Sequence, residues 1–261
     1  MDDNNNYVSE EFNIHVNKYV VKVLRKSPQK SDLHENPALL LSFAMDKYTS
    51  LNIRPYNITA DMFLKNGHRV LSFDLPNHGE RIDKYGENIE GFRNALIDGA
   101  DPFLVFLTDA DAVINYCINE GIVNLGNIFV CGTSRAGYLA IRLLAANCKV
   151  SAAAAYAPVT DWGCLSEFVK DVDSDIVKNI RLSSYVDKIA GKPIFITIGS
   201  EDKRVSSQSC CRFFVDLINA HIKNGYDVNN INFYLTDDTG HSCSDIWYEM
   251  GGRFLLGKIV F

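Results

Sequence analysis

The sequence predicts an α/β fold in which a mostly parallel, doubly wound sheet has helices on both faces. Three observations support this prediction. Short, continuous apolar runs are typical of strands that are buried on both faces of a sheet. Helical stretches alternate with these runs along the chain, which predicts right-handed crossovers between parallel strands. A hydrophobic content of 47% is enough for a core on each face.

The elements follow in a regular order. Residues 12–16 and 19–24 alternate and are rich in β-branched side chains, which predicts one or two antiparallel strands at an edge of the sheet. The parallel strands are expected in the apolar runs at 38–44, 69–73, 127–131, 151–157, 193–198 and 231–235. Helices are expected at 57–66, 101–121, 136–147, 206–224 and 244–256.

The domain organisation is expected to be simple. No linker rich in Pro, Gly or Ser divides the 261 residues and no internal repeat is present, so we expect a single domain over residues 1–261. The segment 159–191 is long for a connection and has mixed helical signals. We expect it to form a small cap over the site.

Composition excludes several classes of function. A net charge of −6 argues against a broad nucleic-acid surface, which needs clustered Lys and Arg. No stretch approaches a membrane span, and residues 1–6 lack the basic flank and apolar run of a secretory signal, so the expected location is cytoplasmic. Seven scattered cysteines predict reduced thiols, and the absence of ligand-spaced Cys and His predicts neither metal nor cofactor. Nothing in the sequence specifies an oligomeric state.

A candidate nucleophile lies between a predicted strand and a predicted helix. The segment Gly132-Thr133-Ser134-Arg135-Ala136 leaves the apolar run 127–131 and enters the helix expected at 136–147. This context is typical of a nucleophile elbow, in which bulky side chains two residues before and after the Ser would collide. Because the helix points its first N–H groups at the site, the Arg135 amide is a candidate oxyanion donor.

An acid and a histidine follow in the chain order that such a site requires. Asp202 comes directly after the predicted strand 193–198, with Glu201 as an adjacent alternative. His241 lies after the last predicted strand and before the final helix. Ser134, His241 and Asp202 therefore predict nucleophile, general base and orienting acid of a catalytic triad.

These motifs resemble the α/β-hydrolase superfamily, in particular the catalytic domain of prolyl oligopeptidase-type and acylaminoacyl-peptidase-type enzymes and their stand-alone esterase relatives. The likeness extends over most of the chain. It rests on the elbow, residues 157–162, residues 183–189, residues 202–205 and Gly240-His241. Residues 74–81 also resemble a loop of small bacterial esterases in which the His-Gly pair is mainly structural, which implies a loop-stabilising role for His78.

Two departures from the family pattern shape the expected activity. No β-propeller precedes the hydrolase unit, so ester hydrolysis is expected more than peptide hydrolysis. The first oxyanion loop reads His-Gly-x in these families but has Phe43 and Ala44 here. The resemblance implies that the Met45 amide is the second oxyanion donor. A shift of this alignment by one residue, which would place the donor on a neighbour of Met45, is left open. Asp46 is expected to be a solvated loop carboxylate.

Three functions are compatible with these residues. The first is a serine hydrolase that cleaves a small carboxylic ester through an acyl-serine intermediate, and the second is a small peptidase or amidase acting on a short peptide. The third is a non-catalytic binding module on a hydrolase fold. Two interpretations of the Arg135 side chain are possible: it attracts an acidic acyl group of the substrate, or it faces solvent.

Overall fold

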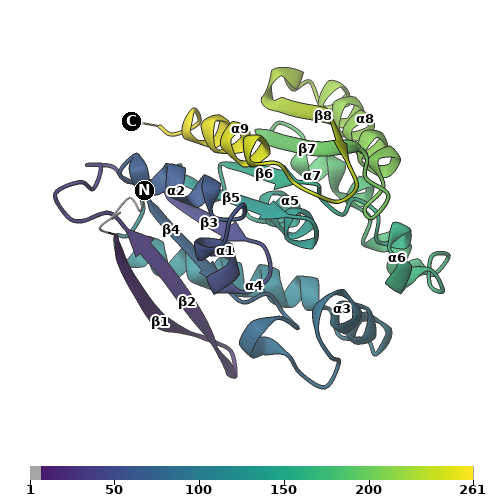
Figure 1. The fold of residues 1–261 in the computed structure, drawn as a ribbon, viewed down its shortest axis with the longest axis horizontal. Helices are drawn as coiled ribbons and strands as arrows, with labels where there is room; N and C mark the ends of the chain where they lie inside the picture. The colour runs from purple at the N-terminus through teal and green to yellow at the C-terminus, as the bar shows by residue number, and fades with distance from the viewer. Residues whose placement is uncertain (1–6, 261) are drawn as a thin grey trace.

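A single eight-stranded sheet organises the protein in a computed structural model that describes residues 7–260. The strand order is β1-β2-β4-β3-β5-β6-β7-β8 (Figure 1). The β1–β2 hairpin pairs antiparallel with β4, and the remaining neighbours are parallel. The predicted fold class is confirmed. The strands are Val8–Val16, Tyr19–Ser27, Leu39–Phe43, Arg69–Phe73, Ile128–Thr133, Ala152–Tyr156, Ile194–Glu201 and Ile231–Thr239.

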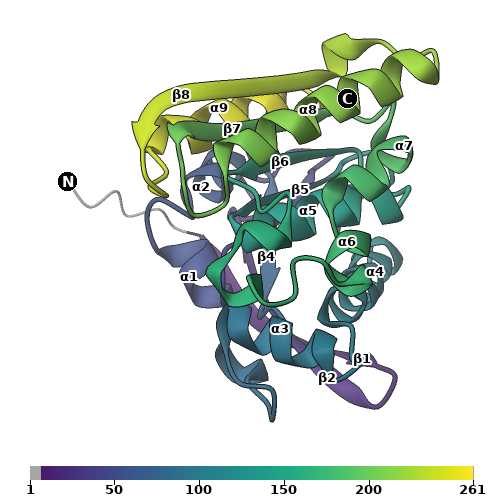
Figure 2. The ribbon, with the colours of Figure 1, turned by 90° about the vertical axis from the view of Figure 1, so that its right-hand side faces the viewer.

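Helices cover both faces of the sheet, as Figures 1 and 2 show. Helices α2 (Ile58–Lys65) and α9 (Asp245–Leu256) pack together on one face. On the other face lie α4 (Pro102–Asn119), α5 (Arg135–Ala146) and α8 (Ser207–Lys223). These five helices agree with the predicted ones to within two residues at each end.

Outside the segment 159–191, two further helices of the described chain were not predicted. The first, α1 (Lys47–Asn52), has six residues, which is too short for an apolar periodicity to appear. The second, α3 (Asn88–Ile97), contains Gly91, which is unfavourable inside a helix. A Cβ at Gly91 would lie 2.6 Å from the Gly86 carbonyl oxygen and 2.7 Å from the Cβ of Asn77. The glycine is therefore needed for the close approach of a neighbouring loop.

The last two strands extend beyond their predicted ends. Strand β7 continues to Glu201 and β8 to Thr239. Because β8 pairs on one side only, its side chains are partly exposed or exposed along its whole length. The end of β8 can therefore carry polar residues. The predicted strand stopped at residue 235 because the apolar run ends there.

The segment 159–191 folds into short helical turns over α3, α4 and α5. These are η2 (Trp162–Cys164), η3 (Ser166–Phe168), α6 (Asp175–Asn179), η4 (Leu182–Tyr185) and α7 (Val186–Ile189). Trp162 is fully buried against Phe92, Phe103 and Tyr138. The cap role of this segment and the single-domain organisation of residues 1–261 stay predictions.

The remaining expectations concern the thiols, a membrane span, a metal site and a secretory signal. All seven cysteines are unpaired. Within residues 7–260, no helix combines the length and the apolar character needed to cross a membrane. The same residues contain no cluster of three His, Cys, Asp or Glu side chains arranged for a metal ion. Residues 1–6, on which the prediction about a secretory signal rested, lie outside the described part of the chain.

Candidate active site

The elbow at Ser134 forms a sharp turn between β5 and α5. Ser134 has φ 57° and ψ −118°, a conformation that L-residues rarely adopt. Its N–H donates to the Tyr156 carbonyl at 2.8 Å, and its own carbonyl accepts from the Val159 N–H at 3.1 Å. A Cβ at position 132 would lie 2.2 Å from the Ala136 carbonyl oxygen, so only glycine fits there.

Asp202 and His241 join Ser134 in one hydrogen-bonded chain. The Asp202 Oδ2 lies 2.7 Å from the Nδ1 of His241, and the Nε2 of His241 lies 3.0 Å from the Ser134 Oγ. The second oxygen of Asp202 accepts backbone N–H groups of Arg204 at 2.9 Å and Val205 at 3.1 Å.

This arrangement determines the direction of the hydrogen bonds. The Asp202 side chain is fully buried, while that of His241 is 26% exposed. An ionised carboxylate only accepts, so Nδ1 of His241 carries a proton and Nε2 is free to accept the Ser134 hydroxyl proton. Glu201, the adjacent alternative, is exposed. Asp202 is therefore the acid that contacts the histidine.

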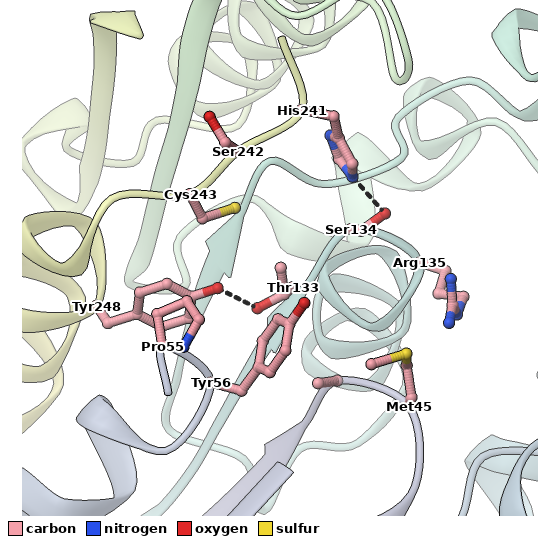
Figure 3. A pocket seen from close by; sticks show the side chains of 11 residues that line it. Met45, Pro55, Tyr56, Thr133, Ser134, Arg135, His241, Ser242, Cys243 and Tyr248 are labelled. Atoms are coloured by element: carbon pink, nitrogen blue, oxygen red, sulfur yellow. Dashed lines mark hydrogen bonds between the residues drawn. The ribbon is translucent and has the colours of Figure 1, made fainter. Parts of the chain in front are cut away.

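A cavity of about 360 Å³ opens beside Ser134 (Figure 3). Its lining comes from residues 44–45 after β3, residues 55–56 before α2, residues 133–135 of the elbow, and residues 241–243 and Tyr248. None of these residues belongs to the segment 159–191, for which a cap over the site is predicted.

The arrangement agrees with the comparisons with known proteins. The model of the prolyl oligopeptidase family matches residues 105–249, more than half of the chain. The chain belongs to this family. It is a family of serine hydrolases, so the resemblance read from the sequence is confirmed. The matched region contains Ser134, Asp202 and His241 but begins well after Met45. No curated protein sequence matches significantly.

Solved structures show the same fold. An esterase of Pyrococcus furiosus is 19% identical, with a TM-score of 0.67 over 98% of this chain and 95% of that one. An acylaminoacyl peptidase of Pyrococcus horikoshii is 13% identical, with a TM-score of 0.71 over 96% of this chain and 41% of that one. Dipeptidyl peptidase 4 of Porphyromonas gingivalis is 16% identical, with a TM-score of 0.72 over 96% of this chain and 35% of that one. At these identities the likeness concerns the fold alone.

Two backbone amides of this family member are available at the cavity. The Arg135 amide starts α5, so it has no intrahelical acceptor, and Met45 lines the cavity from the loop after β3. Among residues 7–260, neither amide has a hydrogen-bond acceptor. The Ala44 amide, by contrast, donates to the Ser50 Oγ at 2.9 Å. This bond favours Met45 over a donor one residue earlier.

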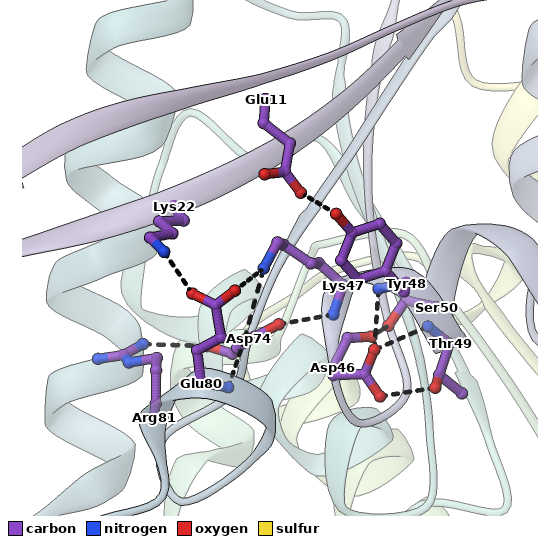
Figure 4. Close-up of polar contacts among 10 residues, drawn as sticks. All are labelled: Glu11, Lys22, Asp46, Lys47, Tyr48, Thr49, Ser50, Asp74, Glu80 and Arg81. Atoms are coloured by element: carbon purple, nitrogen blue, oxygen red, sulfur yellow. Dashed lines mark hydrogen bonds and ion pairs between the residues drawn. The ribbon is translucent and has the colours of Figure 1, made fainter.

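Asp46 is the N-cap residue of α1, and its side chain is not a solvated loop carboxylate. Its Oδ1 accepts the Tyr48 and Thr49 amides, each at 2.9 Å, and its Oδ2 accepts the Thr49 hydroxyl at 2.6 Å (Figure 4). Burial raises the pKa of Asp46, but the hydrogen bonds outweigh it and leave the pKa below its usual value. The expectation of a solvated loop carboxylate is wrong, because the side chain caps a helix that was not predicted.

Lys47 is a buried cation beneath the Met45 loop that sequence reasoning missed. Its side chain is 1% exposed, and its Nζ lies 3.7 Å from the Asp74 Oδ2 and 3.5 Å from the Glu80 Oε1. Asp74 also accepts the backbone N–H groups of Lys47 at 2.8 Å and Glu80 at 2.9 Å (Figure 4). Lys22 completes the network with an exposed ion pair to Glu80 at 2.7 Å. The network joins the loop after β3 to the loop after β4.

His78 lies buried inside the loop after β4. Its Nδ1 donates to the Pro76 carbonyl at 2.8 Å, and its ring packs against Phe92. Burial lowers the pKa of His78 to about 4, so the imidazole is neutral. These contacts are within the loop and its immediate neighbours, as a loop-stabilising role requires.

Cys243 places a thiol in the same cavity as Ser134. Burial raises the pKa of Cys243 to about 12, so the thiol is protonated at neutral pH. Because the thiolate and not the thiol is the nucleophile, Cys243 does not compete with Ser134.

Proposed function

We propose that the protein hydrolyses a small carboxylic ester through an acyl-enzyme on Ser134, with His241 and Asp202 as the other triad members. The supporting observation is the continuous chain from Asp202 through His241 to Ser134, with separations of 2.7 Å and 3.0 Å, at the edge of a cavity. Both separations are within hydrogen-bond reach without any rearrangement.

The chemistry proceeds in two halves. The Ser134 Oγ attacks the ester carbon while His241 Nε2 takes the hydroxyl proton, and Asp202 stabilises the imidazolium. The Arg135 and Met45 amides donate to the oxyanion. His241 then returns the proton to the alcohol oxygen as the carbon–oxygen bond breaks. Water repeats the sequence on acyl-Ser134, adding hydroxide to the acyl carbon and releasing the acid and free Ser134.

The cavity lining argues against a peptide that is bound by a free amino terminus. A short peptide bound by its amino terminus needs an acidic partner for its ammonium group. The eleven side chains that line the cavity include neither Asp nor Glu. Peptidase or amidase activity is the second candidate, supported by family membership. A non-catalytic binding module is disfavoured because all three triad groups are in contact.

A labelling and turnover experiment tests this proposal. A fluorophosphonate probe should label the wild type and Ser242→Ala but not Ser134→Ala, because Ser242 lies in the cavity without contact to a base. Ser134→Ala should lower p-nitrophenyl acetate hydrolysis by about 10³-fold or more. Unchanged turnover in that variant, with circular dichroism showing a folded protein, would contradict the assignment. Faster cleavage of alanine p-nitroanilide than of the ester would favour the peptidase.

We also propose a cytoplasmic location and a small-molecule substrate without a nucleic-acid partner. Seven unpaired thiols support a reducing compartment, and a net charge of −6 opposes nucleic-acid binding.

A further inference from the structure

Arg135 places a cation in the cavity without a protein carboxylate to neutralise it. Seven other arginines of the described chain form ion pairs with Asp or Glu. Arg135 forms none within residues 7–260: its Nη2 donates to the exposed Asn88 Oδ1 at 3.3 Å, and its Nε is buried without an acceptor. A half-buried guanidinium with an unused donor is costly unless a ligand supplies the acceptor.

The neighbouring charges do not compensate Arg135. Glu167 approaches the site but binds Arg204 through both oxygens, at 2.5 Å and 2.7 Å. Asp46 is occupied at the start of α1, and His78 is neutral. Burial, and to a smaller extent the nearby Arg204, lowers the pKa of Arg135. An arginine side chain nevertheless keeps its proton in proteins. The guanidinium therefore remains charged and unpaired.

The position of Arg135 also fits substrate recognition. Figure 3 shows its side chain beside Met45 and Ser134, while Tyr248 and Cys243 lie toward the other end of the cavity. The two alternatives read from the sequence were a solvent-facing side chain and one that attracts an acidic group. A half-buried position in the wall of the cavity favours the second.

We propose that the Arg135 guanidinium binds a carboxylate of the ester substrate and makes the enzyme selective for anionic esters. This inference rests on the proposed ester hydrolysis and adds the class of substrate. The carboxylate belongs either to the acyl part, as in the half-ester of a dicarboxylic acid, or to the alcohol part, as in the ester of a hydroxy acid. Arg suits this role because its planar fork can bind both carboxylate oxygens.

Matched substrate pairs distinguish the two positions of the carboxylate. Mono-p-nitrophenyl adipate and p-nitrophenyl hexanoate have the same chain length and differ by a charge on the acyl part. Sodium 4-acetoxybenzoate and methyl 4-acetoxybenzoate differ by a charge on the alcohol part. The measured quantity is the ratio of kcat/KM for the charged and neutral member of each pair, so effects common to both substrates cancel.

The test variant is Arg135→Gln, which removes the charge while the backbone amide stays. We expect it to lower the charged-to-neutral ratio of one pair by about 10- to 100-fold, mainly through KM. Arg253→Gln removes the same charge from an exposed position on α9 and should leave both ratios unchanged. Equal ratios in wild type and Arg135→Gln for both pairs would overturn the inference, whereas the proposed function would still rest on Ser134→Ala.

A binding measurement keeps the inference testable without turnover. Monophenyl adipate should bind Ser134→Ala about 10- to 100-fold more tightly than Ser134→Ala/Arg135→Gln in calorimetry, if the charge is on the acyl part. If the charge is on the alcohol part, 4-acetoxybenzoate should show this difference in affinity in place of monophenyl adipate. Equal affinity of the two variants for both ligands would refute a role for Arg135, whatever reaction the protein catalyses.

Discussion

Two regions supply the two amides proposed to stabilise the oxyanion, and they are built differently. The elbow positions the Arg135 amide through backbone geometry: a glycine at 132, a positive φ at Ser134 and the start of α5. The loop after β3 positions the Met45 amide above a buried network that includes Lys47 and Asp74. The first region occupies five consecutive residues, whereas the second joins segments some thirty residues apart.

The comparison shows that an amide can be positioned by steric exclusion or by buried charge. Steric exclusion at the elbow depends on one missing Cβ and is insensitive to pH. Buried charge below the Met45 loop depends on the pairing of ionised groups in a place with little water. Only the first region falls in the part that matches the family model, residues 105–249. We therefore expect the two regions to respond differently to substitution.

The largest effect should come from breaking the elbow with Gly132→Ala. The added Cβ would lie 2.2 Å from the Ala136 carbonyl oxygen, so β5 or the first turn of α5 must shift. We expect ester turnover to fall by at least about 100-fold and the free energy of unfolding by about 2–4 kcal/mol. Urea unfolding and kcat/KM are the measurements.

Gly257→Ala is the control for the elbow, because it adds a Cβ at φ −70° with no neighbour closer than 3.4 Å. It should change neither quantity appreciably. Wild-type turnover in Gly132→Ala would show that steric exclusion does not position the Arg135 amide.

A smaller effect is expected when the loop network is broken with Lys47→Met. This change leaves Asp74 buried with backbone donors only, and Glu80 with Lys22 alone. We expect the free energy of unfolding to fall by about 2–3 kcal/mol, and kcat by about 10-fold as the Met45 amide loses its position. Lys22→Met removes an exposed cation of the same network and serves as the matched control. A loss of stability with unchanged kcat would separate Lys47 from the oxyanion site.

The smallest expected effect is a change in how the free energy of unfolding depends on pH, and it comes from His68. His68 is buried, its Nδ1 accepts the Ala38 amide at 3.2 Å, and burial lowers its pKa to about 4. The unfolded chain binds a proton near pH 6.5, so between pH 6.5 and 4 it binds more protons than the folded chain. His68 therefore makes the free energy of unfolding fall as pH falls through this range, by on the order of 1–3 kcal/mol.

The variant His68→Asn should remove this part of the pH dependence. The Asn Oδ1 can accept the Ala38 amide but does not titrate. Urea unfolding at a series of pH values from 4 to 7 measures the slope, and replacing the exposed His15 with Asn controls for the loss of a histidine. An identical slope in His68→Asn and wild type would exclude His68 as its source.

The placement of residues could be predicted where its determinants are local. The turn at Ser134 was predictable because a strand, a small-residue turn and a helix follow one another directly, and the positions of Asp202 and His241 because each follows a strand. The burial of Lys47 could not be predicted, because its partner Asp74 lies in another loop. Asp46 was misjudged for the same reason that α1 was missed: a helix of six residues has no periodicity to detect.

The two nucleophilic atoms of the cavity have a practical consequence for chemical probes. An ordinary cysteine is far more acidic than a serine, yet here the thiol of Cys243 is protonated and the Ser134 hydroxyl has a base at 3.0 Å. Reactivity in this cavity follows from the position of one imidazole and not from the intrinsic acidity of either side chain. Serine-directed and thiol-directed reagents should consequently modify different residues of the protein. We expect alkylating agents to react first with the exposed Cys148.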